Sequence, residues 1–278
     1  MSFQTLLVHV EPEPTPDPRL ALAIDLANQL DAKLIGVGAE MYGTSGMGGG
    51  LDYGSAEIFA LLATTTEENI KRAEEKFRAS AALVKRGSQW RGAVQFPTAK
   101  IVAEARAADL VITSQGHRKR GSGLTVAPPG PLIMQAGRPV LVAPPTADRL
   151  TIKNIVVAWK EAREARRVVA DALPFLKAAA NVVLVEICDS IEADPATRQH
   201  LEEIGDYLSR HGVKASILVV AEARLNSAAE QLLDIAKQQK ADLIVAGAYG
   251  HSRFQEWVFG GFTRALLGQT ELAVLFSH

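Results

Sequence analysis

The chain has 278 residues, of which 47% are apolar and 22% are charged, and its formal net charge is −1. This length suits one large domain or two medium ones, each able to bury a core of its own. The near-zero net charge gives no electrostatic basis for binding nucleic acid or an anionic membrane. No apolar run approaches the roughly 18–20 residues that a bilayer-spanning helix needs.

The cysteine content and the N-terminal segment indicate the compartment. The single cysteine, Cys188, cannot form an intramolecular disulfide, and it lies in a predicted strand. The segment MSFQTLLVHV lacks the basic stretch of a signal peptide, and Glu11 interrupts its apolar residues. We therefore expect a cytoplasmic protein in which Cys188 is a buried, reduced thiol.

The first half alternates short apolar runs with amphipathic segments. The apolar runs are typical of buried parallel strands, which are predicted at Phe3–Val10, Lys33–Val37, Ala93–Phe96, Asp109–Thr113 and Pro139–Ala143. Helical spacing predicts helices at Arg19–Leu30, Ser55–Arg86 and Thr98–Ala107. Gly87 fits the C′ position of the second helix, and Thr98 fits the N-cap of the third. One stripe of the long helix is predicted to be buried, formed by Ile58, Leu62, Ala73, Phe77, Ala81 and Val84.

A glycine-rich loop, Gly43–Gly54, precedes the long helix. Its six glycines oppose a fixed conformation. We expect a mobile segment that acts as a lid over the first half and is the first site of limited proteolysis.

The second half repeats the alternation. Strands are predicted at Ile152–Ala158, Asn181–Ile187, Val213–Val220, Leu243–Ala246 and Leu272–Phe276. Helices are predicted from the first of these strands to Leu176, and then at Pro195–His211, Ser227–Gln239 and Phe262–Leu267. Pro174 predicts a kink or break in the first helix, and Gly212 ends the second.

Local identity between the halves indicates a duplication. Ala108-Asp-Leu-Val-Ile is echoed by Ala241-Asp-Leu-Ile-Val, an offset of 133 residues. We therefore predict an α/β fold of two tandem doubly wound domains, 1–147 and 148–278, each a five-stranded parallel sheet flanked by helices. The closing strands of the halves, at Pro139–Ala143 and Leu272–Phe276, are short and apolar and are expected at sheet edges, where unpaired backbone groups promote association.

The strand at Leu243–Ala246 is followed by glycines at a fixed spacing, Gly247-x2-Gly250-x9-Gly260, with Gly261 next. Glycines let the backbone approach a ligand closely, and the helix that follows offers N–H groups and a positive dipole end to an anion. The same glycines are also compatible with ordinary tight turns. No Gly-Lys-Ser/Thr follows, so the loop is not a P-loop.

This glycine pattern resembles the G-x2-G-x9-G-(Ser/Thr) nucleotide loop of the universal stress protein family, and the segments that flank it are similar too. The resemblance covers the chain as two copies and implies a Rossmann-like stress-response regulator that binds ATP, with or without Mg²⁺, in the second half. In related single-domain proteins the closing strands pair across a dimer. The resemblance therefore implies that Pro139–Ala143 and Leu272–Phe276 pair within this chain as a pseudo-dimer, with a further homodimer through other surfaces. The site residues that it implies are Ala158, Trp159, Lys160, Ile187, Gly247, Ala248, Gly250, His251, Arg253, Gly260, Gly261, Phe262 and Thr263.

The chain departs from the family pattern at two of these positions. Lys160 stands near the place of an Asp that contacts the nucleoside, and Gly261 replaces a hydroxyl residue, although Thr263 lies two residues further on. In the first half Ser114 replaces the first glycine of the loop, so we expect no nucleotide there. The alternative reading is a scaffold of the same fold that binds no nucleotide.

A catalytic role has no support in the residue pattern. The six histidines lack metal-ligand spacing, and no nucleophile elbow, zinc-binding helix or Cys–His pairing is present. An enzymatic reading is limited to slow ATP hydrolysis or a transferase activity without a recognised base.

Overall fold

The computed structural model describes residues 2–13, 16–42, 55–114, 126–188, 195–221, 227–248, 261–269 and 271–278. The elements of the first half are β1 (Thr5–His9), α1 (Pro18–Gln29), β2 (Lys33–Glu40), α2 (Ser55–Ala81), β3 (Ser88–Val94), α3 (Pro97–Glu104), a 3₁₀ turn (Ala105–Ala107), β4 (Leu110–Ser114), α4 (Pro129–Gln135) and β5 (Val140–Ala143). Those of the second half are β6 (Asn154–Trp159), α5 (Arg163–Ala178), β7 (Asn181–Cys188), α6 (Pro195–Arg210), β8 (Ala215–Ala221), α7 (Ala228–Gln238), β9 (Leu243–Gly247), α8 (Gly261–Gln269) and β10 (Ala273–Ser277). The predicted alternation of strands and helices is confirmed in both halves. The glycine-rich loop 43–54 lies outside the described residues.

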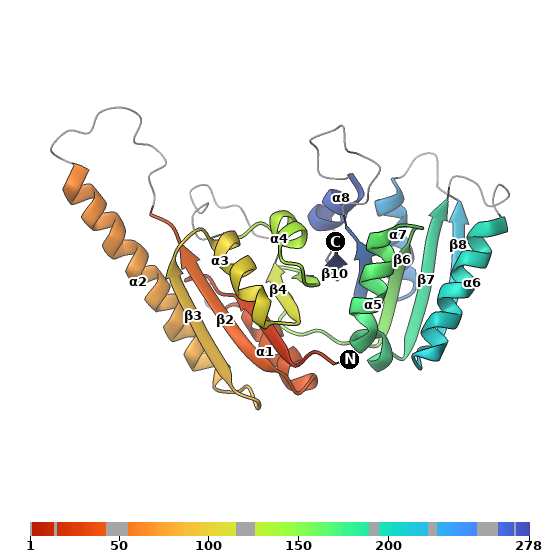
Figure 1. The fold of residues 1–278 in the computed structure, drawn as a ribbon, viewed down its shortest axis with the longest axis horizontal. Helices are drawn as coiled ribbons and strands as arrows, with labels where there is room; N and C mark the ends of the chain where they lie inside the picture. Colours follow the sequence, from red (N-terminus) through yellow and green to blue (C-terminus); the bar gives the residue numbers. More distant parts are fainter. Residues whose placement is uncertain are drawn as a thin grey trace.

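The strands form one sheet in the order β3-β2-β1-β4-β5-β10-β9-β6-β7-β8 (Figure 1). Pairing is parallel within each half, and the halves meet where β5 pairs antiparallel with β10. In that pairing Leu141 lies opposite Leu275, and Val140 opposite Phe276. The predicted pseudo-dimer is therefore confirmed, since each closing strand covers an edge that the other would otherwise expose.

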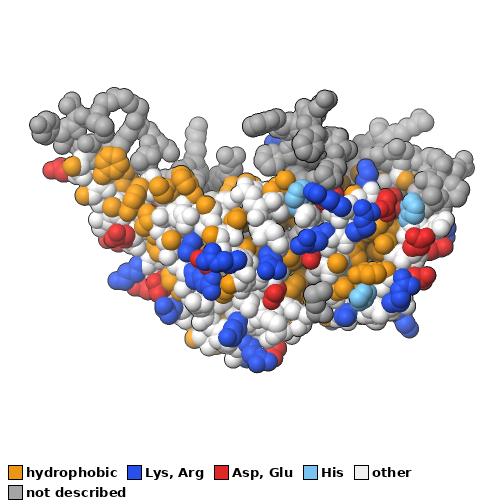
Figure 2. Space-filling view, viewed as in Figure 1, with side chains coloured by type: hydrophobic (Ala, Val, Ile, Leu, Met, Phe, Trp, Pro, Cys, Tyr) orange, Lys and Arg blue, Asp and Glu red, His pale blue; other side chains and the backbone are white. Residues whose placement is uncertain are grey.

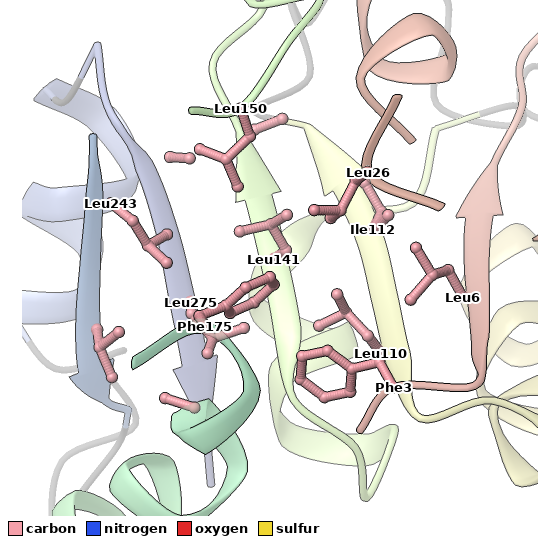
Figure 3. Close-up of a cluster of buried hydrophobic side chains, with 14 of the residues drawn as sticks. Phe3, Leu6, Leu26, Leu110, Ile112, Leu141, Leu150, Phe175, Leu243 and Leu275 are labelled. Carbon is pink, nitrogen blue, oxygen red and sulfur yellow. The ribbon is translucent and has the colours of Figure 1, made fainter. Parts of the chain in front are cut away.

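Helices cover both faces of the sheet and enclose two apolar cores. On one face α1, α2, α5 and α6 enclose a first core, and on the other α3, α4, α7 and α8 enclose a second. Neighbouring strand residues alternate between the cores: Leu6 faces the first and Leu7 the second. The first core crosses the junction of the halves, where the rings of Phe3 and Phe175 lie 5.1 Å apart (Figure 3).

The repeated Ala-Asp pair has a structural role that the sequence comparison did not assign. One carboxylate oxygen of Asp109 accepts hydrogen bonds from the backbone N–H groups of Gln4 and Thr5, at the start of β1. Asp242 accepts the equivalent bonds from Lys153 and Asn154, at the start of β6. Each Asp thus provides a hydrogen-bond acceptor for backbone N–H groups that would otherwise lack a partner at the start of the neighbouring strand.

The long helix α2 begins at Ser55 as predicted, but its end and the exposure of its first turns differ from the prediction. It ends at Ala81 instead of Arg86, so Gly87, with a φ of 86°, lies in the turn before β3 and is not a C′ residue. Val84 returns to the core through a turn in which its N–H group donates to Ala81 O. Ile58 is 46% exposed instead of buried, because the first turns of α2 extend past the sheet (Figure 1).

Three other local predictions are wrong. The third strand is Ser88–Val94, several residues earlier than predicted, because it pairs with the whole length of β2. Helix α3 has Phe96 at its N-cap and Pro97 at its first position, so Thr98 lies inside it. Pro174 does not break α5, which continues to Ala178. Among the helices that the structure describes, none is long and apolar enough to cross a membrane.

Candidate functional site

The chain order of the second half creates a topological switch point between β6 and β9. These strands are parallel neighbours, with Ala158 beside Ala246. The chain leaves β6 for α5 on the first-core face, and it leaves β9 for α8 on the second-core face. In open α/β sheets, ligands bind beyond the carboxyl ends of two such strands, since the connections diverge there and leave the edge uncovered.

The residues that end β6 differ in environment. Trp159 is 4% exposed and packs in the first core, and its indole Nε1 is buried with no hydrogen-bond partner among the described residues. Ala158 is half-buried against the second core. Lys160 follows the strand and is exposed, without an ion pair to any residue that the structure describes. Of the three, only Lys160 places a charge at the switch point.

On the neighbouring strand β7, Ile187 and Cys188 occupy the last two positions. Ile187 is half-buried against the second core. Cys188 is also only half-buried, with Sγ 3.6 Å from Val220 O, which corrects the prediction of a buried thiol. By register β6 ends opposite Glu186, so Cys188 extends beyond β6 and has a strand neighbour only in β8.

Gly247, the first glycine of the loop, is required by packing. A Cβ at this position would lie 2.7 Å from the Glu164 carbonyl carbon and 2.8 Å from the Ala165 nitrogen, both in the first turn of α5. These are backbone atoms and cannot rotate away. The next residue, Ala248, is fully buried, and its N–H group donates to Ser277 O at 3.0 Å. The close approach of α5 therefore explains this glycine without a ligand.

Helix α8 begins at Gly261, where a Cβ would meet no atom within 4 Å. Phe262 is half-buried against the second core, and Thr263 is 3% exposed. The structure thus brings Lys160, Gly247 and Ala248 to neighbouring strand ends and places Gly261–Thr263 at the start of the next helix. The remaining predicted site residues lie outside the described residues, namely Gly250, His251, Arg253 and Gly260.

The equivalent switch point of the first half, between β1 and β4, contains a side chain that the sequence analysis did not single out. By strand register Glu11 is the counterpart of Lys160, and Ser114 is the counterpart of Gly247. Arg19, the second residue of α1, is 5% exposed and bridges the two. Its Nη1 donates to Glu11 Oε1 at 3.0 Å and to Ser114 Oγ at 3.3 Å.

Further charges surround this guanidinium and form, with Arg19 and Glu11, what we call the Arg19 cluster. Its other members are Asp17, the N-cap of α1, and Lys76 of α2, whose Nζ lies 3.1 Å from Asp17 Oδ2. Burial by itself would lower the pKa of Arg19, but Asp17 and Glu11 raise it above its ordinary value, so the side chain stays cationic. The sequence signal was an arginine at a helix start that follows the acids Glu11, Glu13 and Asp17 of the preceding loop. It is weak, because such charges usually lie in solvent.

Comparisons with known proteins agree with this architecture. The sequence model of the universal stress protein family matches residues 151–278. Among curated proteins no sequence matches the chain. The structure of a universal stress protein from Archaeoglobus fulgidus aligns over 98% of this chain and 97% of its own, with a TM-score of 0.66 and 11% identity. A Pseudomonas aeruginosa protein proposed to be a universal stress protein aligns over 99% and 93%, with a TM-score of 0.62 and 16% identity.

The two structural alignments extend over both halves, whereas the sequence match is confined to the second. At identities this low the structural likeness concerns the fold. The chain therefore shares the fold of these universal stress protein structures over both halves, and its second half is similar in sequence to the universal stress protein family.

Proposed function

We propose that the protein is a cytoplasmic stress-response regulator that binds an adenine nucleotide, ATP with or without Mg²⁺, at the switch point between β6 and β9. The proposal rests on the difference between the switch points of the two halves. In the first half the buried side chain of Arg19 occupies the switch point. In the second half Gly247 brings no side chain there, and Lys160 is exposed without a described ion pair.

The start of α8 supplies a suitable environment for phosphate oxygens. The first N–H groups of a helix have no partner within the helix, and the dipole makes this end positive. Among the described residues no atom lies within 4 Å of a Cβ placed at Gly261, which supports access of a ligand to these donors. Lys160 adds a cation at the end of β6, where a phosphate oxygen could accept from its ammonium group. The adenine would lie toward the end of β7, beside the backbone of Ile187.

Two observations favour the second candidate function, a scaffold that keeps the fold and binds no nucleotide. Gly247 is explained by the approach of α5, so the first loop glycine is not independent evidence for a ligand. Lys160 brings a cation where an acceptor for ribose or adenine hydrogen bonds would be expected from the resemblance. A scaffold would act through protein contacts alone.

Calorimetric titration with ATP and Mg²⁺ decides between the two functions. We expect Gly260→Val to weaken binding at least tenfold, about 1.4 kcal/mol, because a β-branched side chain would obstruct the phosphates at the helix start. Gly116→Val, in the first half, is the matched control and should leave the affinity unchanged. Thermal melts check that both variants fold. No binding by the wild type, or equal affinity in all three proteins, would refute nucleotide binding and favour the scaffold.

A further inference from the structure

Strand β3 is an end strand of the sheet, and its outer edge is unpaired within the described residues. Its backbone groups alternate in direction. Leu34 N–H donates to Gly87 O, and Gln95 N–H donates to Glu40 O, which fixes the pattern between them. In a parallel pair every second residue turns both its N–H and its C=O toward the neighbour. The outward groups therefore belong to Ser88, Trp90, Gly92 and Val94, and an unpaired edge of this kind is a template for another strand.

A groove of about 350 Å³ follows this edge between β3 and α2. Ile70 and Trp90 contribute apolar surface to it, together with Val94, which is 38% exposed. Gly92 lets Trp90 and Ile70 pack over the strand: a Cβ there would lie 2.8 Å from Trp90 Nε1 and 3.0 Å from Ile70 Cγ2. The edge thus offers backbone hydrogen bonds and apolar contacts side by side.

We propose that a second copy of this chain docks on the outer edge of β3 and the adjacent face of α2. The copies would be related by a two-fold axis, with β3 antiparallel to its partner. The axis would pass near Arg91, so that Trp90 lies opposite Gly92 of the other copy and their outward backbone groups pair. Antiparallel pairing about this point joins the two sheets into one continuous sheet.

The charges on α2 argue for a second copy as the occupant. Glu67, Lys71, Glu74 and Arg78 recur at helical spacing along one stripe, and the first three line the groove. An antiparallel copy centred between Lys71 and Glu74 places Lys71 opposite Glu74 and Glu67 opposite Arg78. Every pair is then of opposite charge, and the stripe complements itself.

The centre of the charge stripe coincides with the centre of the strand pairing. Ile70 lies beside Gly92, and the rings of Phe77 and Trp90 are 5.5 Å apart. The level of Arg91 along β3 therefore corresponds to the middle of the stripe on α2. One axis satisfies both patterns, although neither pattern requires the other.

Apolar residues at the two ends of α2 fit the same arrangement. Leu61, near the start of α2, is 67% exposed, and Leu83, just after its end, is 72% exposed. Figure 2 shows hydrophobic side chains gathered at the upper left, over the first turns of α2 as placed in Figure 1. In an antiparallel pair the start of one α2 meets the end of the other, which brings these two apolar ends to the same side of the contact.

A charge reversal with rescue tests the proposal by sedimentation equilibrium on the full chain. The wild type should be a dimer, and Lys71→Glu should weaken dimerisation at least tenfold, because it sets a carboxylate of each copy against Glu74 of the other. The double variant Lys71→Glu with Glu74→Lys restores opposite charges and should recover most of the affinity. Lys237→Glu, on exposed α7, is the matched control and should not change it.

Hydrogen exchange gives a second readout that reports strand pairing directly. The amides of Trp90 and Gly92 should exchange more slowly in the wild-type dimer than in Lys71→Glu at the same concentration. A wild type that stays monomeric at about 100 µM overturns the proposal. So does a dimer that Lys71→Glu leaves intact or that the double variant fails to restore, since either result places the contact elsewhere or assigns this edge to a different partner.

Discussion

Gly247→Ala tests whether packing or a ligand requires the first loop glycine. The new Cβ would stand 2.7 Å and 2.8 Å from backbone atoms of α5 and 3.0 Å from the Glu164 Cβ. Carbon atoms in van der Waals contact are about 3.5–4.0 Å apart, so α5 or β9 must shift by several tenths of an ångström. Overpacking of this kind costs about 1–3 kcal/mol. We therefore expect the nucleotide-free protein to lose that amount of unfolding free energy.

Urea unfolding followed by circular dichroism measures the loss, and a thermal melt should show a decrease of about 2–4 °C for each kcal/mol. Gly261→Ala is the matched control from the same loop. Its Cβ would meet no atom within 4 Å, and alanine suits a helix better than glycine, so this variant should be as stable as the wild type or slightly more stable. If Gly247→Ala unfolds at the same urea concentration as the wild type, the packing explanation is wrong.

Three further substitutions test other parts of the structure. Arg19→Met removes the guanidinium that pairs with Glu11, while Lys76 still pairs with Asp17, and should cost about 3–5 kcal/mol in urea unfolding; a change below about 1 kcal/mol would contradict a buried ion cluster. Ser227→Ala removes the capping box of α7 and should cost about 1 kcal/mol in the same assay, whereas an unchanged midpoint would mean that water replaces the cap. Burial alone would raise the pKa of Glu104, but hydrogen bonds from Lys100 and Arg91 lower it below its ordinary value. The contribution of Glu104 to folding stability is therefore fully present above the pKa of the unfolded state, about 4.3. It is lost as the pH falls through the lower pKa of the folded state. Glu104→Gln should consequently flatten the acid limb of a stability–pH curve, and an unchanged limb would exclude Glu104 as its source.

The order of elements could be predicted from the sequence because a parallel sheet buried on both faces needs continuous apolar strands. Runs such as Leu243–Ala246 have no polar alternation, and the helices between them carry one apolar face. The pairing of the two closing strands was expected from the resemblance and from their open edges, whereas its antiparallel direction comes from the structure. These features are local in sequence or follow from a general rule about edges.

The errors occur where the tertiary environment overrides a local signal. The apolar spacing of α2 continues through Val84, yet the helix ends at Ala81 because the chain must turn to bring β3 beside β2. Ile58 belongs to the apolar stripe by spacing, but no sheet lies beneath it. Sequence periodicity reports which side of a helix is apolar. It does not report how far the partner surface extends.

The switch points illustrate a deeper difficulty, since the same position carries different constraints in the two halves. Ser114 and Gly247 end equivalent strands, and each faces the second residue of the following helix on the first-core face, Arg19 or Glu164. Where α5 approaches closely only glycine fits. In the first half, the hydroxyl of Ser114 accepts a hydrogen bond from Arg19, and the Arg19 cluster occupies the switch point. In the first half, Ser114 in place of the loop glycine is therefore linked to the buried cation of Arg19. A glycine pattern alone does not show whether packing or a ligand requires the glycine. The variants Gly247→Ala and Gly260→Val distinguish the two cases. Replacing a glycine required by packing lowers the unfolding free energy of the nucleotide-free protein, whereas replacing a glycine required by a ligand lowers only the affinity for the nucleotide.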